Sequence, residues 1–187
     1  MGMKRIVTGH ATTCTPGKEP VVKILINGEP EYTSYANTVQ IAQVWQTHGM
    51  PTHVQGEKDE AKEANPNAIV VQDGSNLRWG ELQPGAFVAM HRTSSVDYNI
   101  MTHGTIALVT PKEELDPNDI PTDLNDPRLE HTLASQGDVI VQRGTLHGWL
   151  NKGDVPAAWV SVIVPAESYK TAEGDTVKDG FWAKKSA

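Results

Sequence analysis

The sequence predicts an all-β protein made of one domain, and three observations support this. Short runs rich in β-branched residues are bounded by Gly, Pro and Asn, a pattern typical of strands. Helical periodicity is scarce along the 187 residues. The chain also contains 16 Gly and 12 Pro, which favours many short strands joined by turns. A chain of this length falls within the usual range for one domain.

The N-terminal half is predicted to consist of strands and one exposed loop. Residues 5–9 and 20–27 are β-branched runs closed by turn residues. Residues 37–48 fit either a half-buried strand or a short helix, and we favour the strand. Residues 55–67 are polar and charged, which predicts an exposed loop. Residues 68–110 contain several short runs with no room for crossover helices, which indicates antiparallel pairing.

The C-terminal half is predicted to contain one long surface loop, further strands and a tail that docks on the body. Residues 111–136 hold Pro117, Pro121, Pro127 and seven acidic residues, so we expect a surface excursion there. The aromatic rings of Phe181 and Trp182 predict that the polar tail packs against the body. Strands are expected again at 137–143, 146–151 and 157–165.

The composition excludes several classes of partner. The formal net charge is −7, and no basic run is longer than Lys184-Lys185, which argues against nucleic acids and anionic membrane surfaces. No stretch approaches about 20 apolar residues, so we expect no membrane span. The single Cys14 forms no intramolecular disulfide, and residues 1–10 lack an apolar signal region. We therefore expect a cytoplasmic protein whose partner is a small molecule.

Two segments carry the residues that point to chemistry. In residues 84–104 a glycine, a histidine, an acidic residue and a second glycine follow one another at spacings of five and six intervening residues, as Gly85, His91, Asp97 and Gly104. The segment 137–151 adds Gly137, Gly144, His147 and Asn151. Together they resemble the two signature motifs of the cupin superfamily. The sequences HRTxSxDY and GDVxVQRGTxHxW are similar to those of small single-domain cupins of bacteria and fungi.

The resemblance implies a cupin-type double-stranded β-barrel of jelly-roll topology with an N-terminal strand arm. It covers about 84–165, which we expect to form the barrel core within a single domain. Residues 1–80 are then the arm, and 166–187 are the tail. Small cupins typically pair through N-terminal strands, so the resemblance also implies a homodimer.

The departures from the cupin motifs bear on metal binding. A metal-loaded cupin supplies three histidines and a glutamate, whereas here Thr93 and Asp97 stand at two of those positions. The remaining His91, Asp97 and His147 match a two-histidine, one-carboxylate set for iron, manganese or zinc. The alternative is a hydrogen-bonded polar network without metal. We favour no cofactor and expect divalent metal to bind weakly or not at all.

Strand alternation predicts which other side chains face the barrel interior, because successive residues of a strand point to opposite faces. If Asp97 and His147 point inward, the residues at period two from them do so too: Asn99, Met101, His103 and Trp149. The expected substrate contacts are Thr93, Asn99, Met101, Gln142 and Trp149.

An imidazole beside a carboxylate can move protons at neutral pH. We predict that His147 acts as general base or acid, that Asp97 orients it, and that His91 or His103 supplies the complementary proton. The resemblance implies a lyase or isomerase that tailors an apolar or aromatic secondary metabolite, polyketide-like compounds included. The alternatives are a non-haem metal-dependent dioxygenase that uses His91, Asp97 and His147, and a non-catalytic binding cupin.

Overall fold

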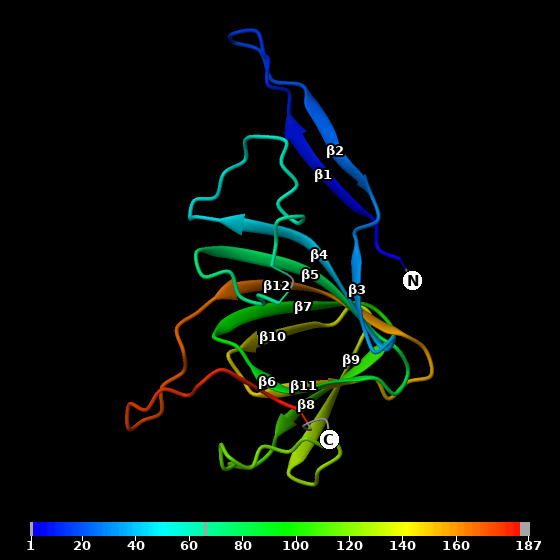
Figure 1. Ribbon diagram of the computed structural model, residues 1–187, viewed down its shortest axis with the longest axis vertical. Helices are drawn as coiled ribbons and strands as arrows, with labels where there is room; N and C mark the ends of the chain where they lie inside the picture. The colour runs from blue at the N-terminus through cyan, green and yellow to red at the C-terminus, as the bar shows by residue number, and fades with distance from the viewer. Residues whose placement is uncertain (1, 66, 184–187) are drawn as a thin grey trace.

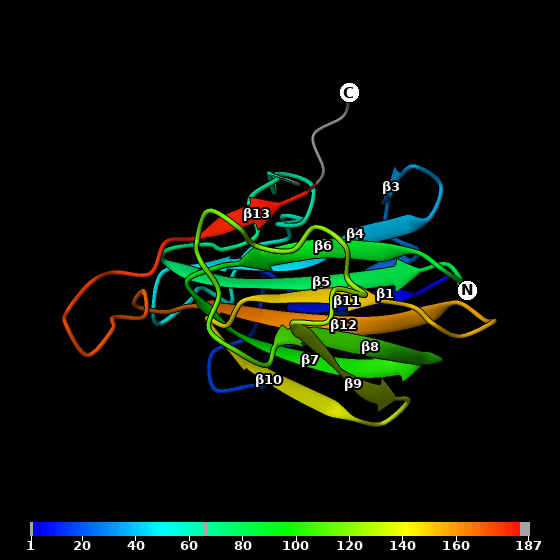
Figure 2. The ribbon, with the colours of Figure 1, turned by 90° about the horizontal axis from the view of Figure 1, so that it is seen from below.

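Thirteen β-strands in three antiparallel sheets make up the computed structural model, which describes residues 2–65 and 67–183 (Figures 1 and 2). A six-stranded sheet has the order β10 (Val139–Arg143), β7 (Ser95–His103), β12 (Ala157–Pro165), β5 (Gly74–Leu82), β4 (Val39–His48) and β3 (Tyr32–Tyr35). A five-stranded sheet has the order β13 (Gly180–Trp182), β6 (Phe87–Arg92), β11 (His147–Leu150), β8 (Thr105–Pro111) and β9 (Leu129–Ser135). These two sheets face each other as a jelly-roll barrel, which confirms the predicted fold class.

The third sheet is a hairpin of β1 (Arg5–His10) and β2 (Val22–Gly28), which projects from the body (Figure 1). The arm is shorter than expected, because β3, β4 and β5 continue the six-stranded sheet and only β1 and β2 stand apart. Several apolar side chains of the hairpin are exposed, Ile6, Val22 and Ile24 among them. The homodimer through this arm stays a prediction. No helix in the described ranges is long and apolar enough to cross a membrane.

The barrel core lies between the two facing sheets and is built from alternate residues of their strands. Trp149 of β11 stacks on Trp159 of β12, with ring centroids 5.5 Å apart and an interplanar angle of 30°. Leu82 and Met101 pack in the same cluster. The ring of Trp159 also lies over Gly80, where an added Cβ would come within 2.9 Å of it. The stacked Trp149 and Trp159 rings join the two sheets and bound one end of the space between them.

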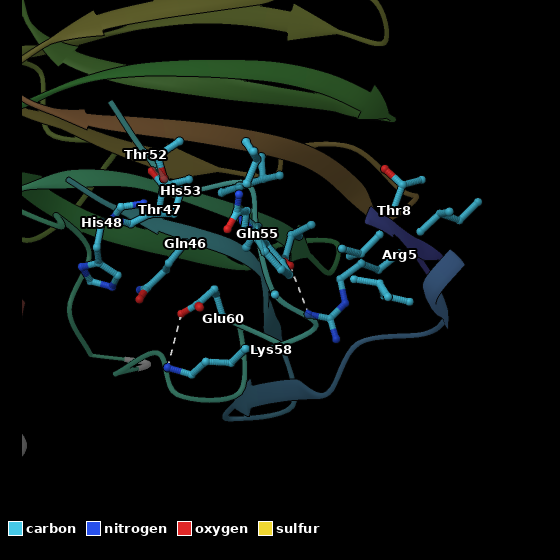
Figure 3. Close-up of a pocket in the computed structure, with 18 residues that line it drawn as sticks. Arg5, Thr8, Gln46, Thr47, His48, Thr52, His53, Gln55, Lys58 and Glu60 are labelled. Carbon is cyan, nitrogen blue, oxygen red and sulfur yellow. Dashed lines mark hydrogen bonds and ion pairs between the residues drawn. The ribbon is translucent and has the colours of Figure 1, made fainter. Parts of the chain in front are cut away.

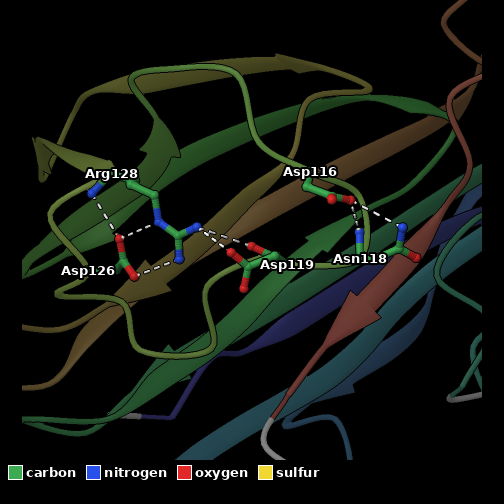
Figure 4. A network of polar contacts seen from close by, with 5 residues as sticks. All are labelled: Asp116, Asn118, Asp119, Asp126 and Arg128. Carbon is green, nitrogen blue, oxygen red and sulfur yellow. Dashed lines mark hydrogen bonds and ion pairs between the residues drawn. The ribbon is translucent and has the colours of Figure 1, made fainter.

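The predicted surface loop at 111–136 is shorter in the structure, because β9 (Leu129–Ser135) pairs with β8 along its whole length. The sequence did not predict this strand, because prolines and acidic residues precede it and its apolar and polar residues alternate only weakly. The loop that remains is fastened by Arg128, which donates to Asp126 and Asp119, as Figure 4 shows. This guanidinium lowers the pKa of Asp126 to about 2. Leu124 anchors the loop in a second apolar cluster.

The C-terminal tail docks as predicted. Phe181 pairs with His91 through β13 and β6, and Trp182 packs against the second apolar cluster. Just before β13, Asp179 accepts hydrogen bonds from the backbone N–H and the hydroxyl of Ser94. The tail therefore extends the five-stranded sheet next to the strand that carries His91.

Asn151 fastens the turn that follows β11. Its side-chain amide donates to the carbonyl oxygens of Leu82 and Val155, and its Oδ1 accepts from the N–H of Gly153, each at 2.9 Å. We expect Asn151→Ala to lower the free energy of unfolding by about 3 kcal/mol, since the buried carbonyl oxygen of Leu82 is left without its partner and the two other hydrogen bonds of the amide are lost. The melting temperature should fall by about 10 °C. Asn118→Ala in the exposed loop is the matched control, and equal melting of the two variants would contradict the prediction.

Candidate functional site

A cavity of about 500 Å³ opens between the two large sheets. His91 of β6 and His147 of β11 lie on one wall, and Asp97, Asn99 and Gln142 lie on the opposite wall. Most of the other lining side chains are apolar or aromatic, and Arg78 and Ser161 are also among them. The structure therefore brings six of the predicted site residues, Trp149 included, to one mostly apolar cavity, the usual character of a small-molecule site.

The two histidines face each other directly across β6 and β11. They are register partners, and their ring centroids lie 4.1 Å apart. Nδ1 of His91 donates to the carbonyl oxygen of Ala89 at 2.8 Å, and Nδ1 of His147 donates to that of Thr145 at 2.9 Å. Since a carbonyl oxygen only accepts, each neutral ring carries its proton on Nδ1 and leaves the Nε2 lone pair free.

Burial keeps both imidazoles neutral. Desolvation lowers the pKa of His91, and desolvation together with the neighbouring His91 lowers the pKa of His147 to about 3. A base of that strength is poorly matched to proton transfer at neutral pH. The predicted role of His147 as general base or acid stays a prediction, and Thr145, instead of Asp97, orients its ring.

Asp97 presents an unpartnered carboxylate oxygen. The residue is only 8% exposed, and its Oδ1 has no hydrogen-bond partner within the part of the chain that the structure describes. Burial raises the pKa of this carboxyl, while a hydrogen bond from Ser95 opposes the rise. A desolvated carboxylate is a stronger base than one in water.

A chain of hydrogen bonds runs along the wall that carries Asp97. Nε1 of Trp159 donates to Oγ of Ser161 at 3.1 Å, and that hydroxyl donates to Oδ1 of Asn99 at 2.5 Å. Nδ2 of Asn99 then donates to Oε1 of Gln142 at 2.7 Å. All four side chains line the cavity and are buried.

The residues present do not fit a three-ligand metal centre. The free Nε2 lone pairs of His91 and His147 suit a cation, and the carbonyl partners of their Nδ1 atoms resemble the outer contacts of metal-binding histidines. Asp97 lies on the opposite wall, however, and no three His, Cys, Asp or Glu residues among those described come together as ligands. Two imidazoles alone are an incomplete set of protein ligands.

Three further predicted site residues lie away from the cavity. Thr93 does not line it, because its hydroxyl is hydrogen-bonded to that of Ser95 at 2.9 Å. His103 is half-buried at the end of β7 and is likewise not part of the lining, since the last lining residue of β7 is Asn99, four residues earlier. Met101 is buried in the core beside Trp149, which also lines the cavity.

Several lining residues were not predicted as part of the site. Ser161 and Trp159 come from β12, and Arg78 comes from β5 beside them in the same sheet. Neither strand contains a recognisable motif. The alternation of β12, placed beside β7, is the signal that would have found Ser161.

A second cavity of about 520 Å³ lies between β1, β4 and the loop that follows β4 (Figure 3). Arg5 at its edge forms a bidentate pair with Asp59, and Lys58 pairs with Glu60. The charged groups here bind each other, so the cavity between the large sheets remains the candidate site.

Comparisons with known proteins agree with the motif resemblance. The chain is 26% identical over 182 residues to the cupin-domain-containing oxidoreductase srdD of Neurospora crassa, covering 95% of this chain and 84% of that protein. This relative and the barrel fold support a cupin domain. This cupin is also 34% identical over 112 residues to phomopsin biosynthesis cluster protein D of Diaporthe leptostromiformis, covering 60% of the chain and 50% of that protein. It spans about half the length of this relative and of cluster protein C'.

Among solved structures, the polyketide cyclase RemF from Streptomyces resistomycificus aligns with a TM-score of 0.47 and 14% identity, covering 83% of this cupin and 82% of that chain. No protein-family model matches the sequence.

The neutral state of His147 predicts a pH-dependent stability. The pKa of His147 is about 3 in the folded chain and about 6.5 in the unfolded chain. Between these pH values the imidazole is protonated in the unfolded chain and neutral in the folded chain. Stability from this group is complete above pH 6.5 and is lost as the pH falls towards 3. Between pH 7 and 5, urea denaturation should show the wild type losing about 2 kcal/mol more than His147→Gln. Equal losses would show that His147 titrates normally.

Proposed function

We propose that this cupin is an enzyme of secondary metabolism that moves a proton on an apolar or aromatic small molecule, as an isomerase or lyase. The observation that carries the proposal is the unpartnered Oδ1 of Asp97 in a cavity with mostly apolar walls. The names of the relatives support the metabolic setting, since two of them belong to the phomopsin biosynthesis cluster.

Asp97 is the proton carrier in this proposal. Its carboxylate accepts a proton from the substrate, and the neutral carboxyl then returns it to another atom of the substrate. Nδ1–H of each imidazole is engaged by a backbone carbonyl and each Nε2 is unprotonated, so His91 and His147 hold no proton to give. One group therefore takes and returns the proton. Such a sequence suits an isomerisation, or an elimination in which the leaving oxygen takes the proton from Asp97.

The imidazoles then act as acceptors that position the substrate. Both rings line the cavity together with Trp149, whose ring centroid lies 5.5 Å from that of His147. A polar hydrogen of the substrate placed there is held without being transferred, because the ring of His147 protonates only near pH 3.

A metal-dependent oxidoreductase is the second candidate, and the paired Nε2 atoms of His91 and His147 favour it. Three relatives are named cupin-domain-containing oxidoreductases, those of Neurospora crassa, Aspergillus ruber and Hypocrea virens. In this chemistry the cation would supply a Lewis acid or redox centre, and Asp97 would have to approach the imidazoles to complete the ligand set.

Proton abstraction is measurable without knowledge of the natural substrate. We expect the protein to accelerate the exchange of the C1 hydrogens of 2-tetralone with deuterium in D₂O, followed by NMR. Asp97→Asn should lower this acceleration by about a hundredfold or more, since the amide is not a base. His147→Gln should reduce it far less. Exchange that survives in Asp97→Asn and disappears in His147→Gln would reverse the two roles.

Metal analysis separates the two candidates. We expect the purified protein to hold less than one equivalent of iron, manganese or zinc, and we expect EDTA to leave the exchange reaction intact. Asp97→Glu places the carboxylate one methylene closer to the imidazoles, so this variant should bind Zn²⁺ more tightly than the wild type in calorimetry. Stoichiometric metal in the wild type, lost in His91→Ala together with activity, would favour the oxidoreductase.

A further inference from the structure

We infer that the side-chain amide of Gln142 binds the oxygen of an enolisable carbonyl substrate beside the Asp97 carboxylate. This inference rests on the proposed function, because it names the substrate class for the same cavity. Gln142 is 5% exposed and lines the cavity, and its Nε2 has no hydrogen-bond partner among the residues that the structure describes. A buried amide donor without a partner is costly unless a ligand satisfies it.

The hydrogen-bond chain fixes which end of the Gln142 amide faces the ligand. Trp159 Nε1 can only donate, so the hydroxyl of Ser161 accepts from it and passes its own hydrogen to Oδ1 of Asn99. The Asn99 amide must then donate through Nδ2 to Oε1 of Gln142. Both N–H bonds of Gln142 therefore remain available to a ligand in the cavity. The indole N–H of Trp159, three hydrogen bonds away, determines this orientation of the amide.

Register places this donor directly beside the acceptor of Asp97. Gln142 of β10 and Asp97 of β7 are opposite each other in the antiparallel ladder. Directly opposed side chains on one face of a sheet have Cβ atoms roughly 4.5–5.5 Å apart. Asp97 Oδ1 and Gln142 Nε2 thus form an adjacent acceptor and donor, both buried and both without a partner in the described chain.

This pair matches the two ends of an enolisation. The carboxylate of Asp97 takes the proton from the carbon next to the carbonyl, and the C–H electron pair forms the C=C bond. The carbonyl π pair moves to oxygen, where the N–H of Gln142 stabilises the negative charge. The Asp97 carboxyl then returns the proton to carbon or to oxygen, so no electrons enter or leave. Gln142 is a catalytic residue in this scheme, while Asn99, Ser161 and Trp159 are positioning residues.

A binding experiment tests the pair independently of turnover. The probes are 2-naphthol, which resembles the enol of 2-tetralone, and 2-methylnaphthalene, which has the same shape without the oxygen. A single hydroxyl can donate to Asp97 and accept from Gln142, so 2-naphthol should bind about tenfold or more tightly. In ¹H–¹⁵N spectra, the side-chain NH₂ signals of Gln142 should shift with 2-naphthol and stay with 2-methylnaphthalene.

Two variants and a control make the outcome specific. Gln142→Met keeps the volume and removes the donor, so the preference for 2-naphthol should fall about tenfold. Ser161→Ala leaves Gln142 in place and frees the Asn99 and Gln142 amides to turn over, so the preference should fall there too, with the fold checked by circular dichroism. Gln136→Met makes the same change at an exposed turn and should leave the preference unaltered.

The results separate this inference from the proposed function. Equal affinity for the two probes, no binding of 2-naphthol at millimolar concentration, or an unchanged preference in Gln142→Met would overturn the role of Gln142. If 2-tetralone exchange still depends on Asp97 in that case, the proposed proton transfer stands alone. A clear preference for 2-naphthol without any exchange of 2-tetralone would instead support the oxygen-binding role of Gln142 and contradict the proposed proton transfer.

Discussion

The stack of Trp149 on Trp159 is the contact on which the rest of the site depends. One ring belongs to β11 in the five-stranded sheet and the other to β12 in the six-stranded sheet, so their contact sets the separation of the two walls. A glycine at position 80 lets the Trp159 ring lie against β5. Two indoles bury a large apolar area, and they leave the space beyond them for polar side chains of both sheets.

The same indole also determines the polarity of the opposite wall. Buried amides can usually turn over, because either end finds a partner at similar cost. Here Trp159 Nε1 can only donate, and this fixes the direction of each following hydrogen bond in the chain. A packing residue thereby controls a hydrogen-bonding group three contacts away. Core and site are not separate layers in this barrel, since one side chain serves both.

The sequence predicted the strands and the pairing of the histidines better than it predicted the chemistry. Motif spacing placed His91 and His147 together, and the structure makes them register partners. Alternation placed Asn99 correctly and failed for His103, because the cavity ends before the strand does. Whether Asp97 reaches the imidazoles depends on the distance between two walls, which spacing along the chain does not contain. The hydrogen bonds from Nδ1 to Ala89 and Thr145 are likewise invisible before the backbone is folded.

The substitution of aspartate for the motif glutamate changes what the two walls can do together. A longer side chain would carry its carboxylate towards the Nε2 atoms, where three ligands could share one cation. Asp97 lies on the six-stranded wall, beside the Gln142 that β10 places opposite it. Burial desolvates the carboxylate there, so its pKa and its basicity rise. The cavity thus has two different polar walls, with the neutral imidazoles of His91 and His147 on one and the Asp97 carboxylate beside the Gln142 amide on the other.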